Sequence, residues 1–179
     1  MHEVLLSGTV FSPEDCQRIL EMYAFREFED GLIQDNRADF STRKSQIQFI
    51  PPEDDNLWIF ERLQDVATHA NNQTFNFDLD GFREGFQFAK YEIGGHYTWH
   101  CDLGHNERML RKISMTVQLS PEESYEGGQL EFFPARFAVP RQQGMVCVFP
   151  SFMAHRVAPI TKGIRYSLVS WVAGHDPFR

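Results

Sequence analysis

A histidine and an aspartate two positions apart, His100 and Asp102, are of the right types and spacing for metal binding. In an extended strand, residues i and i+2 point to the same face, so this imidazole and this carboxylate can approach one cation from the same side. The pair alone is a weak signal, because seven His and many Asp in the chain produce such pairs by chance. A metal site needs a third ligand.

His155 is the candidate for the third ligand, since it follows the apolar run 145–149 and Pro150-Ser151. Two imidazoles and one carboxylate on a rigid sheet form a facial triad, which leaves three metal positions open and suits non-haem Fe(II). The same ligands also bind zinc, manganese or cobalt, so the ligand set alone does not select iron.

His96 and His105 flank the first pair and are alternative ligands. His96 and His100 have the i, i+4 spacing of a helical zinc site, but the glycine pair at 94–95 and the alternating aromatic residues after it favour a strand. Cys101 should point away from the metal and is interpreted as a core residue.

Arg165 and Ser167 provide a second kind of chemistry. They lie two positions apart on a predicted strand, so both side chains reach the same face. A buried guanidinium with a hydroxyl beside it makes a carboxylate receptor through charge-assisted hydrogen bonds. A metal triad together with this receptor predicts a site for a dicarboxylate co-substrate.

Five stretches of the chain follow one another in the order and spacing of a known family. They are YEIGGHYTWHCD (91–102), RKISMTVQLS (111–120), EGGQLEF (126–132), VFPSFMAH (148–155) and RYSLVSW (165–171). Together they resemble the catalytic core of the Fe(II)/2-oxoglutarate-dependent oxygenases, and specifically the prolyl 4-hydroxylase branch with its small bacterial and viral PKHD-type hydroxylases. Residues 6–20 also resemble the opening strand and helix of that family.

The resemblance implies a role for each of these site residues. His100, Asp102 and His155 match the iron ligands. Arg165 matches the basic residue that pairs with the distal carboxylate of 2-oxoglutarate, and Tyr91 matches a tyrosine that hydrogen-bonds the same carboxylate. A core position at a strand edge is the alternative interpretation of Tyr91.

Three more positions match residues of the co-substrate pocket. Ser114 falls where a hydroxyl group assists the carboxylate, and Ser167 is another candidate for that role. Trp171, six residues after Arg165, matches an aromatic residue of the pocket wall. The alternatives are a buried hydroxyl bonded to the backbone for Ser114, no contact with the carboxylate for Ser167, and a plain core residue for Trp171.

The resemblance also implies the reaction and the cofactors. These are Fe(II), 2-oxoglutarate as co-substrate and O2, with ascorbate as a further cofactor. The implied reaction decarboxylates 2-oxoglutarate to succinate and hydroxylates a prolyl residue in a peptide or protein. The alternatives are the same chemistry on a free amino acid, another side chain or a small molecule, and a non-enzymatic cupin-like binding module. A net charge of -8 and the lack of a basic stripe disfavour nucleic acid.

The elements that must position these residues are helices first and short strands afterwards. Residues 3–11 and 44–50 are predicted strands, and residues 13–28 and 54–70 are predicted helices, the first capped by Ser12 with Asp15 at the capping-box position. From Phe75 onward, short apolar segments alternate with glycine turns, which indicates strands. The expected fold class is mainly β with flanking helices (α+β), and the resemblance implies a double-stranded β-helix, or jelly roll.

Length and composition limit the remaining possibilities. A chain of 179 residues suits one domain, with residues 1–72 as mostly helical support and residues 73–175 as the jelly-roll core. No apolar run approaches the roughly 18 residues of a membrane span, no basic region precedes an apolar stretch at the start, and three Cys without a CxxC pair suggest no disulfide framework. We therefore expect a cytoplasmic protein without membrane partners, as a monomer or weak homodimer.

Two polar loops are expected to lie over the substrate. They are residues 29–42, which are acidic, and residues 103–110, which directly follow Asp102. Loops beside a rigid metal site often act as substrate lids. A solvated surface loop is the alternative interpretation of the first.

Overall fold

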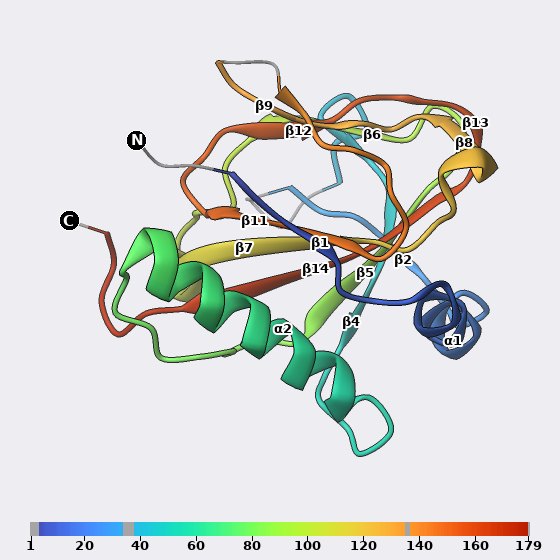
Figure 1. The fold of residues 1–179 in the computed structure, drawn as a ribbon. Coiled ribbons are helices and arrows are strands. Elements are labelled where there is room, and N and C mark those ends of the chain that lie inside the picture. The colour runs from blue at the N-terminus through green and yellow to red at the C-terminus, as the bar shows by residue number, and fades with distance from the viewer. Residues whose placement is uncertain (1–3, 34–37, 135–136, 179) are drawn as a thin grey trace.

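Two antiparallel sheets face each other in the computed structural model, which describes residues 4–33, 38–134 and 137–178 (Figure 1). The larger sheet has the order β1 (Leu5–Thr9), β11 (Met145–Pro150), β7 (Arg111–Gln118), β14 (Arg165–Ala173), β5 (Phe86–Tyr91), β4 (Gln46–Ile50) and β2 (Glu29–Asp30). The smaller sheet has the order β10 (Phe137–Ala138), β9 (Leu130–Phe132), β12 (His155–Val157), β6 (His96–His100) and β3 (Arg43–Lys44). A separate ribbon pairs β8 (Tyr125–Gly127) with β13 (Ile160–Gly163). This arrangement confirms the predicted jelly roll.

Two helices cover the outer face of the larger sheet, on the side away from the smaller one (Figure 1). They are α1 (Pro13–Tyr23) and α2 (Leu57–Ala70). Their apolar residues form the main hydrophobic core with outward-facing residues of the strands; its fully buried members include Ile19, Ile59, Leu63, Phe86, Phe88, Ile113 and Met115. Because the helices cover one face of the larger sheet, its other face points toward the smaller sheet and lines the space between the two sheets.

The predicted start of the first helix is confirmed, and its predicted end is too late. The Ser12 hydroxyl accepts from the Asp15 amide at 3.1 Å, and the Asp15 carboxylate accepts from the Ser12 amide at 3.0 Å, which is a capping box. The helix ends at Tyr23 and not near Phe28. Beyond it the chain turns into the short strand β2, inside the predicted loop 29–42, of which residues 34–37 lie outside the described residues.

The strand predicted around Phe75 and Phe77 is wrong. Residues Asn71–Phe75 instead form a π-helical turn (η1) that continues α2. The Asn71 side chain accepts from the Phe77 amide at 2.8 Å and donates to the Phe77 carbonyl at 3.0 Å, so it folds the chain back on itself. The two aromatic rings at i and i+2 stack on each other at this turn, with centroids 5.6 Å apart, and do not belong to a strand.

The first 72 residues do more than provide helical support, because they also supply strands. β1 pairs with β11, β4 pairs with β5, and β3 pairs with β6 in the smaller sheet. Strand β3 thereby carries the buried Arg43 to the space between the sheets. No helix in the described part of the chain is long and apolar enough to cross a membrane.

Polar side chains gather on the inner face of the larger sheet. Because strand residues alternate between faces, the inner face receives every second residue of three neighbouring strands. Strand pairing aligns Arg165 with Tyr91, Ser167 with Gln118, and Trp171 with Ser114. All six side chains are at least nine-tenths buried. Buried polar groups in this number, facing a second sheet, mark the interior of the barrel as the candidate site.

Candidate metal centre and co-substrate pocket

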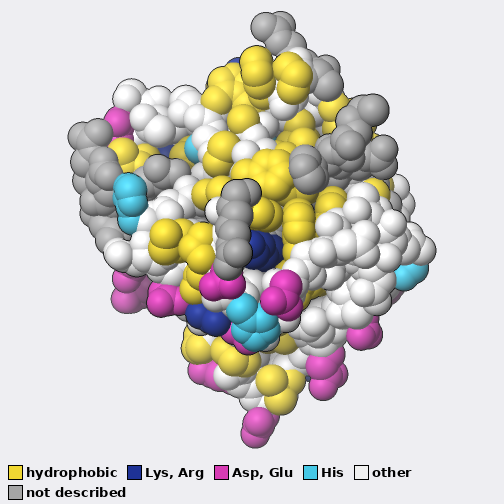
Figure 2. Space-filling model, turned by 90° about the vertical axis from the view of Figure 1, so that its left-hand side faces the viewer, with side chains coloured by type: hydrophobic (Ala, Val, Ile, Leu, Met, Phe, Trp, Pro, Cys, Tyr) yellow, Lys and Arg dark blue, Asp and Glu magenta, His cyan; other side chains and the backbone are white. Residues whose placement is uncertain are grey.

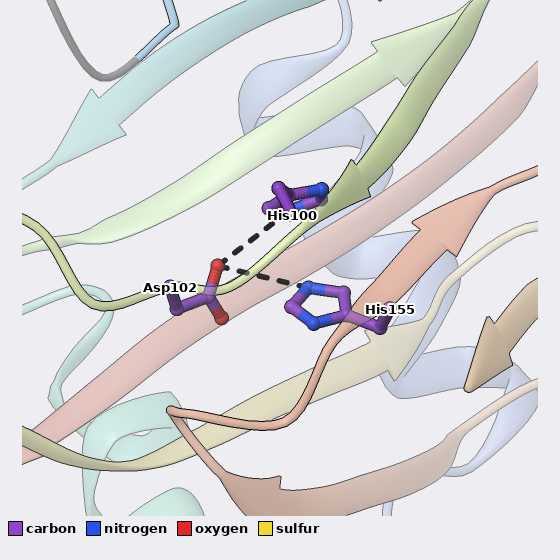
Figure 3. Close-up of side chains that lie close together, drawn as sticks. All are labelled: His100, Asp102 and His155. Atoms are coloured by element: carbon purple, nitrogen blue, oxygen red, sulfur yellow. Dashed lines mark ion pairs between the residues drawn. The ribbon is translucent and has the colours of Figure 1, made fainter. Parts of the chain in front are cut away.

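His100, Asp102 and His155 converge at one point between the sheets (Figure 3). Strands β6 and β12 pair so that His155 lies opposite His100, and Asp102 follows β6 directly. One carboxylate oxygen of Asp102, Oδ1, lies 3.7 Å from His100 Nε2 and 3.6 Å from His155 Nε2. The ligand atoms of all three residues lie within 4.8 Å of one another. One cation can therefore contact all three side chains.

Backbone carbonyls hold both imidazoles in the orientation that metal binding needs. His100 Nδ1 lies 2.7 Å from the Thr98 carbonyl oxygen, and His155 Nδ1 lies 2.9 Å from the Met153 carbonyl oxygen. A carbonyl only accepts, so each Nδ1 carries the proton and each Nε2 presents a lone pair toward Asp102. Hydrogen bonds of this kind orient metal ligands and fix their tautomer.

The protonation states also suit a metal site. Burial and the neighbouring His155 lower the pKa of His100 to about 3, so its imidazole is neutral near pH 7. Burial raises the pKa of Asp102, but His155, His100 and Arg111 outweigh that effect and hold it at about 2. An imidazole binds a metal in its neutral form and a carboxylate in its ionised form. His100 and Asp102 are therefore already in the protonation states that metal binding needs.

An unpaired oxygen of Asp102 supports the presence of a cation. Asp102 Oδ2 is buried and has no hydrogen-bond partner among the described residues. A buried carboxylate oxygen without a partner is costly, and a divalent ion would compensate that cost. The site therefore fits a metal with nitrogen and oxygen ligands, a set that accepts Fe(II) and also zinc or manganese.

A cavity of about 50 Å³ connects the metal ligands to Arg165. His100 and His155 line one end, and the other lining residues include Arg165, Ser167, Tyr91 and Trp171 together with Arg43, Gln87, Thr116 and several apolar side chains. Arg165 is 3% exposed, and it donates from Nε to Gln118 Oε1 at 3.2 Å and from Nη1 to Ser167 Oγ at 3.3 Å. No carboxylate of the described residues pairs with this guanidinium. A buried, uncompensated positive charge beside a metal triad is suited to one end of an anionic ligand.

Ser114 lies at the metal end of the barrel and not at the Arg165 end. Its Oγ is 2.9 Å from Ser151 Oγ, and its hydroxyl helps to lower the pKa of Asp102. Ser114 precedes Gln118 by four residues on β7, which places the two about 13 Å apart along the strand. Of the two predicted hydroxyls, the one beside Arg165 is therefore Ser167.

Trp171 forms part of the cavity wall. Its indole is 5% exposed, and the Arg111 guanidinium lies 3.7 Å from the centre of its ring. The indole N–H is buried and has no partner among the described residues. Arg111 itself is held by a bidentate ion pair with Glu84, both contacts being 2.7 Å. Trp171 lines both the interior cavity and the outer one beside Asp102, as do Arg43, Gln87 and Tyr97.

Sequence reasoning missed two residues that support His100. The Tyr97 ring stacks on the His100 imidazole with centroids 3.5 Å apart, and the Arg43 guanidinium lies 4.7 Å from the centre of the Tyr97 ring. The alternating pattern of β6 contained a signal for Tyr97, because it shares a strand with His100. Arg43 reaches the site only through the pairing of β3 with β6, which a local pattern does not reveal.

The alternative ligands lie away from the metal centre. Both ring nitrogens of His96 contact backbone carbonyls, and His105 is exposed. The interpretation of Cys101 as a core residue is wrong, because it is only partly buried and lines a cavity beside Asp102. Its thiol donates to the Phe152 carbonyl at 3.0 Å.

Both predicted loops line cavities on the outer side of Asp102. Residues 29, 30 and 32 and residues 103 and 108 line a cavity of about 160 Å³ that also includes Asp102 and Arg111. Residues 105–108 line an adjoining cavity of about 340 Å³ with Arg83 and Glu84. Arg108, Arg111 and Trp171 belong to both walls, so the two cavities form one groove beside the metal centre.

Gly128 allows Arg165 to reach its position. Its φ is +64°, and an added Cβ would contact Ile160 Cδ1 and lie 3.1 Å from Arg165 Cδ. Gly128→Ala should lower the free energy of unfolding by more than the roughly 1–2 kcal/mol that a left-handed conformation costs, because it also displaces these side chains. Chemical denaturation would measure the effect. Gly8→Ala is the matched control, since Gly8 has φ +70° and open space around it, and an equal loss in both variants would contradict the prediction.

Comparisons with known proteins give the same family. Residues 86–173 match the 2OG-Fe(II) oxygenase superfamily. A PKHD-type hydroxylase of Synechococcus sp. (strain JA-2-3B'a(2-13)) is 32% identical over 187 residues, covering 94% of this chain and 77% of the relative. Two solved structures share the fold. A Pseudomonas putida prolyl-4-hydroxylase has a TM-score of 0.77 at 22% identity, covering 98% of this chain and 95% of that one.

The second structure is a prolyl hydroxylase in complex with a hypoxia inducible factor oxygen degradation domain peptide fragment from Trichoplax adhaerens. It has a TM-score of 0.80 at 19% identity, covering 97% of this chain and 84% of that one. The curated relative covers nearly the whole chain at an identity that shows descent, and the family match spans the strands that carry the triad and Arg165. This chain therefore belongs to the PKHD-type hydroxylases, within the 2OG-Fe(II) oxygenase superfamily.

Proposed function

We propose that this protein hydroxylates a prolyl residue in a peptide or protein, with decarboxylation of 2-oxoglutarate to succinate. The single observation that carries the proposal is the cavity with a metal triad at one end and the uncompensated Arg165 at the other. His100, Asp102 and His155 would hold Fe(II). Arg165, with Ser167 and Tyr91, would hold the distal carboxylate of 2-oxoglutarate.

Iron and O2 supply the oxidising chemistry when they are bound, and the protein supplies binding and orientation. Arg165 fixes one end of the co-substrate, so the other end meets the metal in a single orientation. The contact of His100 Nδ1 with the Thr98 carbonyl oxygen keeps the His100 ring in place. The Tyr97 ring, which stacks on that imidazole and is itself covered by the Arg43 guanidinium, has the same effect. Trp171, together with Arg43, Gln87 and Tyr97, forms the wall between the interior cavity and the outer groove and would limit the access of water.

A peptide substrate is favoured by the shape of the outer groove. Its two cavities, of about 160 and 340 Å³, share Arg108, Arg111 and Trp171 and are both larger than the interior cavity of about 50 Å³. An extended polypeptide fits such a groove, whereas a small ligand usually binds in a closed pocket. Proline-rich segments are already extended and lose little entropy on binding. The structural relative from Trichoplax adhaerens holds a peptide, which supports the same proposal.

A free amino acid, another side chain or a small molecule is the second candidate for the substrate. Membership of the oxygenase family disfavours the cupin-like module without enzyme activity. Nucleic acid is disfavoured by charge, since the face in Figure 2 shows acidic and hydrophobic side chains and no basic stripe among its described residues. We also propose that residues 1–179 act as a single oxygenase domain, with ascorbate as a further cofactor, as a cytoplasmic monomer or weak homodimer.

Deleting residues 104–109 should abolish most peptide hydroxylation and leave 2-oxoglutarate binding close to that of the wild type. Residues 105–108 line the outer groove, and no residue of the segment 104–109 lines the interior cavity. The measurement is mass spectrometry of a panel of proline peptides, which gain one oxygen atom, together with calorimetric titration of 2-oxoglutarate into Mn(II)-loaded protein.

The control substrates are free proline and other small 2-amino acids, assayed with the same variant. If no proline peptide gains oxygen with the wild-type protein while a free amino acid is turned over efficiently, the peptide assignment is wrong. The metal and co-substrate assignments do not depend on that result.

A further inference from the structure

The phenolic hydroxyl of Tyr125 is a buried polar group whose proton has no acceptor. Tyr125 is the first residue of β8 and is 2% exposed. Its phenolic proton has no acceptor among the described residues. Most buried polar groups in folded proteins are paired, because an unpaired one is costly. An unpaired hydroxyl at this depth therefore suggests a bound ligand.

Arg165 lies beside this hydroxyl. Burial raises the pKa of Tyr125, and the positive charges of Arg165 and Arg141 together with a side-chain hydrogen bond from Arg165 oppose that rise. A guanidinium only donates hydrogen bonds, so a contact with Arg165 still leaves the phenolic proton without an acceptor. Arg165 has no carboxylate partner among the described residues either. One anionic oxygen placed between the two groups would satisfy both.

The position of Tyr125 suits the far end of the co-substrate. It lines a small cavity of about 20 Å³, whose walls share Thr116, Leu130 and Arg165 with the cavity at the metal centre. His100 and His155 line only the latter. Tyr125 therefore lines the side of Arg165 that lies away from the metal, where a ligand spanning both would end.

Gly128 makes room for this pair of side chains. A Cβ at Gly128 would lie 3.1 Å from Arg165 Cδ and 3.4 Å from Tyr125 Cε2. The turn after β8 thus places the Tyr125 ring and the aliphatic part of the Arg165 side chain next to Gly128. Arg141 fixes Tyr125 from the other side by donating to its carbonyl oxygen at 2.9 Å.

We propose that Tyr125 is a co-substrate-binding residue, whose hydroxyl donates a hydrogen bond to the distal carboxylate that Arg165 pairs with. The site would then distinguish 2-oxo dicarboxylates from 2-oxo acids that lack the distal carboxylate. This inference rests on the proposed function, because it assumes that 2-oxoglutarate lies between the triad and Arg165.

The test compares two ligands on the wild type and on Tyr125→Phe. 2-Oxoglutarate and 2-oxopentanoate, which has a methyl group in place of the distal carboxylate, are titrated calorimetrically into Mn(II)-loaded protein. A hydrogen bond to a charged acceptor changes affinity by about 10-fold to 150-fold, so the variant should weaken 2-oxoglutarate binding by that factor. Binding of 2-oxopentanoate should not change, because that ligand cannot accept the bond.

Thermal unfolding separates this role from a structural one. The phenolic proton has no acceptor among the described residues of the ligand-free fold, so Tyr125→Phe should keep or raise the melting temperature of the protein without ligand. The rise in melting temperature caused by 2-oxoglutarate should be smaller than in the wild type. Tyr166→Phe is the control, because Tyr166 lies on the opposite face of β14 and packs on Phe88.

Each outcome has one meaning. If the wild type binds 2-oxoglutarate and Tyr125→Phe binds it equally well, the inference is overturned and the proposed function stands. Equal losses for both ligands would indicate general distortion of the pocket and would also overturn the inference. If the wild type with metal does not bind 2-oxoglutarate, the proposed function fails together with the inference.

Discussion

His155→Ala is expected to lower the affinity for Fe(II) by at least about 100-fold. Loss of a residue that only supports a metal ligand typically weakens binding by about 10- to 100-fold, and loss of the ligand itself removes a direct bond. The variant would leave His100 and Asp102, and two protein ligands hold a labile divalent ion poorly. Anaerobic titration with Fe(II), or with Mn(II) as a redox-stable substitute, measures this directly.

His96→Ala is the matched control for this prediction. His96 begins the strand that His100 ends, and its ring nitrogens contact the carbonyl oxygens of Gly94 and Ser41. Its loss should leave metal affinity within about twofold of the wild type, because it contacts no ligand atom. Unchanged Fe(II) affinity in His155→Ala, or a large loss in His96→Ala, would show that the triad is assigned wrongly.

Local spacing was sufficient to place two of the three candidate metal ligands on one face. His100 and Asp102 are neighbours on one strand, so their common direction follows from the period of two. His155 was harder, since its pairing with His100 depends on the register of β12 against β6. That register cannot be derived from local spacing, so His155 was assigned from the family resemblance of the five sequence stretches. The capping box at Ser12 was likewise predictable, because all of its contacts lie within four residues.

Groups that depend on long-range pairing were not predictable. Gln118 and Tyr125 meet Arg165 only because β7 pairs with β14 and because β8 pairs with β13 just before β14 begins. The π-helical turn at Asn71–Phe75 was mistaken for a strand, because aromatic rings two residues apart occur in both. Alternation of residue types is local, whereas these features depend on which distant strands become neighbours.

Arg165→Ala is expected to weaken 2-oxoglutarate binding by roughly 30-fold or more while metal binding is retained. Removal of one partner of a buried charge-assisted pair costs about 2–5 kcal/mol, and 2 kcal/mol corresponds to about 30-fold. Two buried arginines line the interior cavity, Arg43 and Arg165. The Arg43 guanidinium lies over the Tyr97 ring and donates to Ser45 and Gln87, whereas Arg165 has no acidic partner among the described residues and lies beside Ser167. Titration of 2-oxoglutarate into Mn(II)-loaded variant protein separates this effect from catalysis.

Arg156→Ala is the control for the loss of an arginine near the metal centre. Arg156 lies on β12 next to His155, but it pairs with Glu131 at 2.8 Å and packs over Trp99 on the outer side of the smaller sheet. Its replacement should leave 2-oxoglutarate affinity within about twofold of the wild type, because its ion pair is partly exposed. Equal affinities in Arg165→Ala and the wild type would contradict the assignment of Arg165.

Arg165→Lys tests whether charge alone is enough. A lysine keeps the positive charge but loses the planar fork that donates to Gln118 and Ser167 at the same time. The variant should therefore bind 2-oxoglutarate with an affinity between those of the wild type and Arg165→Ala. Binding as weak as in Arg165→Ala would mean that the geometry of the fork is essential, since the ammonium group would then gain nothing from its charge. Binding as tight as in the wild type would mean that the carboxylate is held by charge with little directional contribution from Arg165, and the neighbouring hydroxyl groups would then determine its orientation.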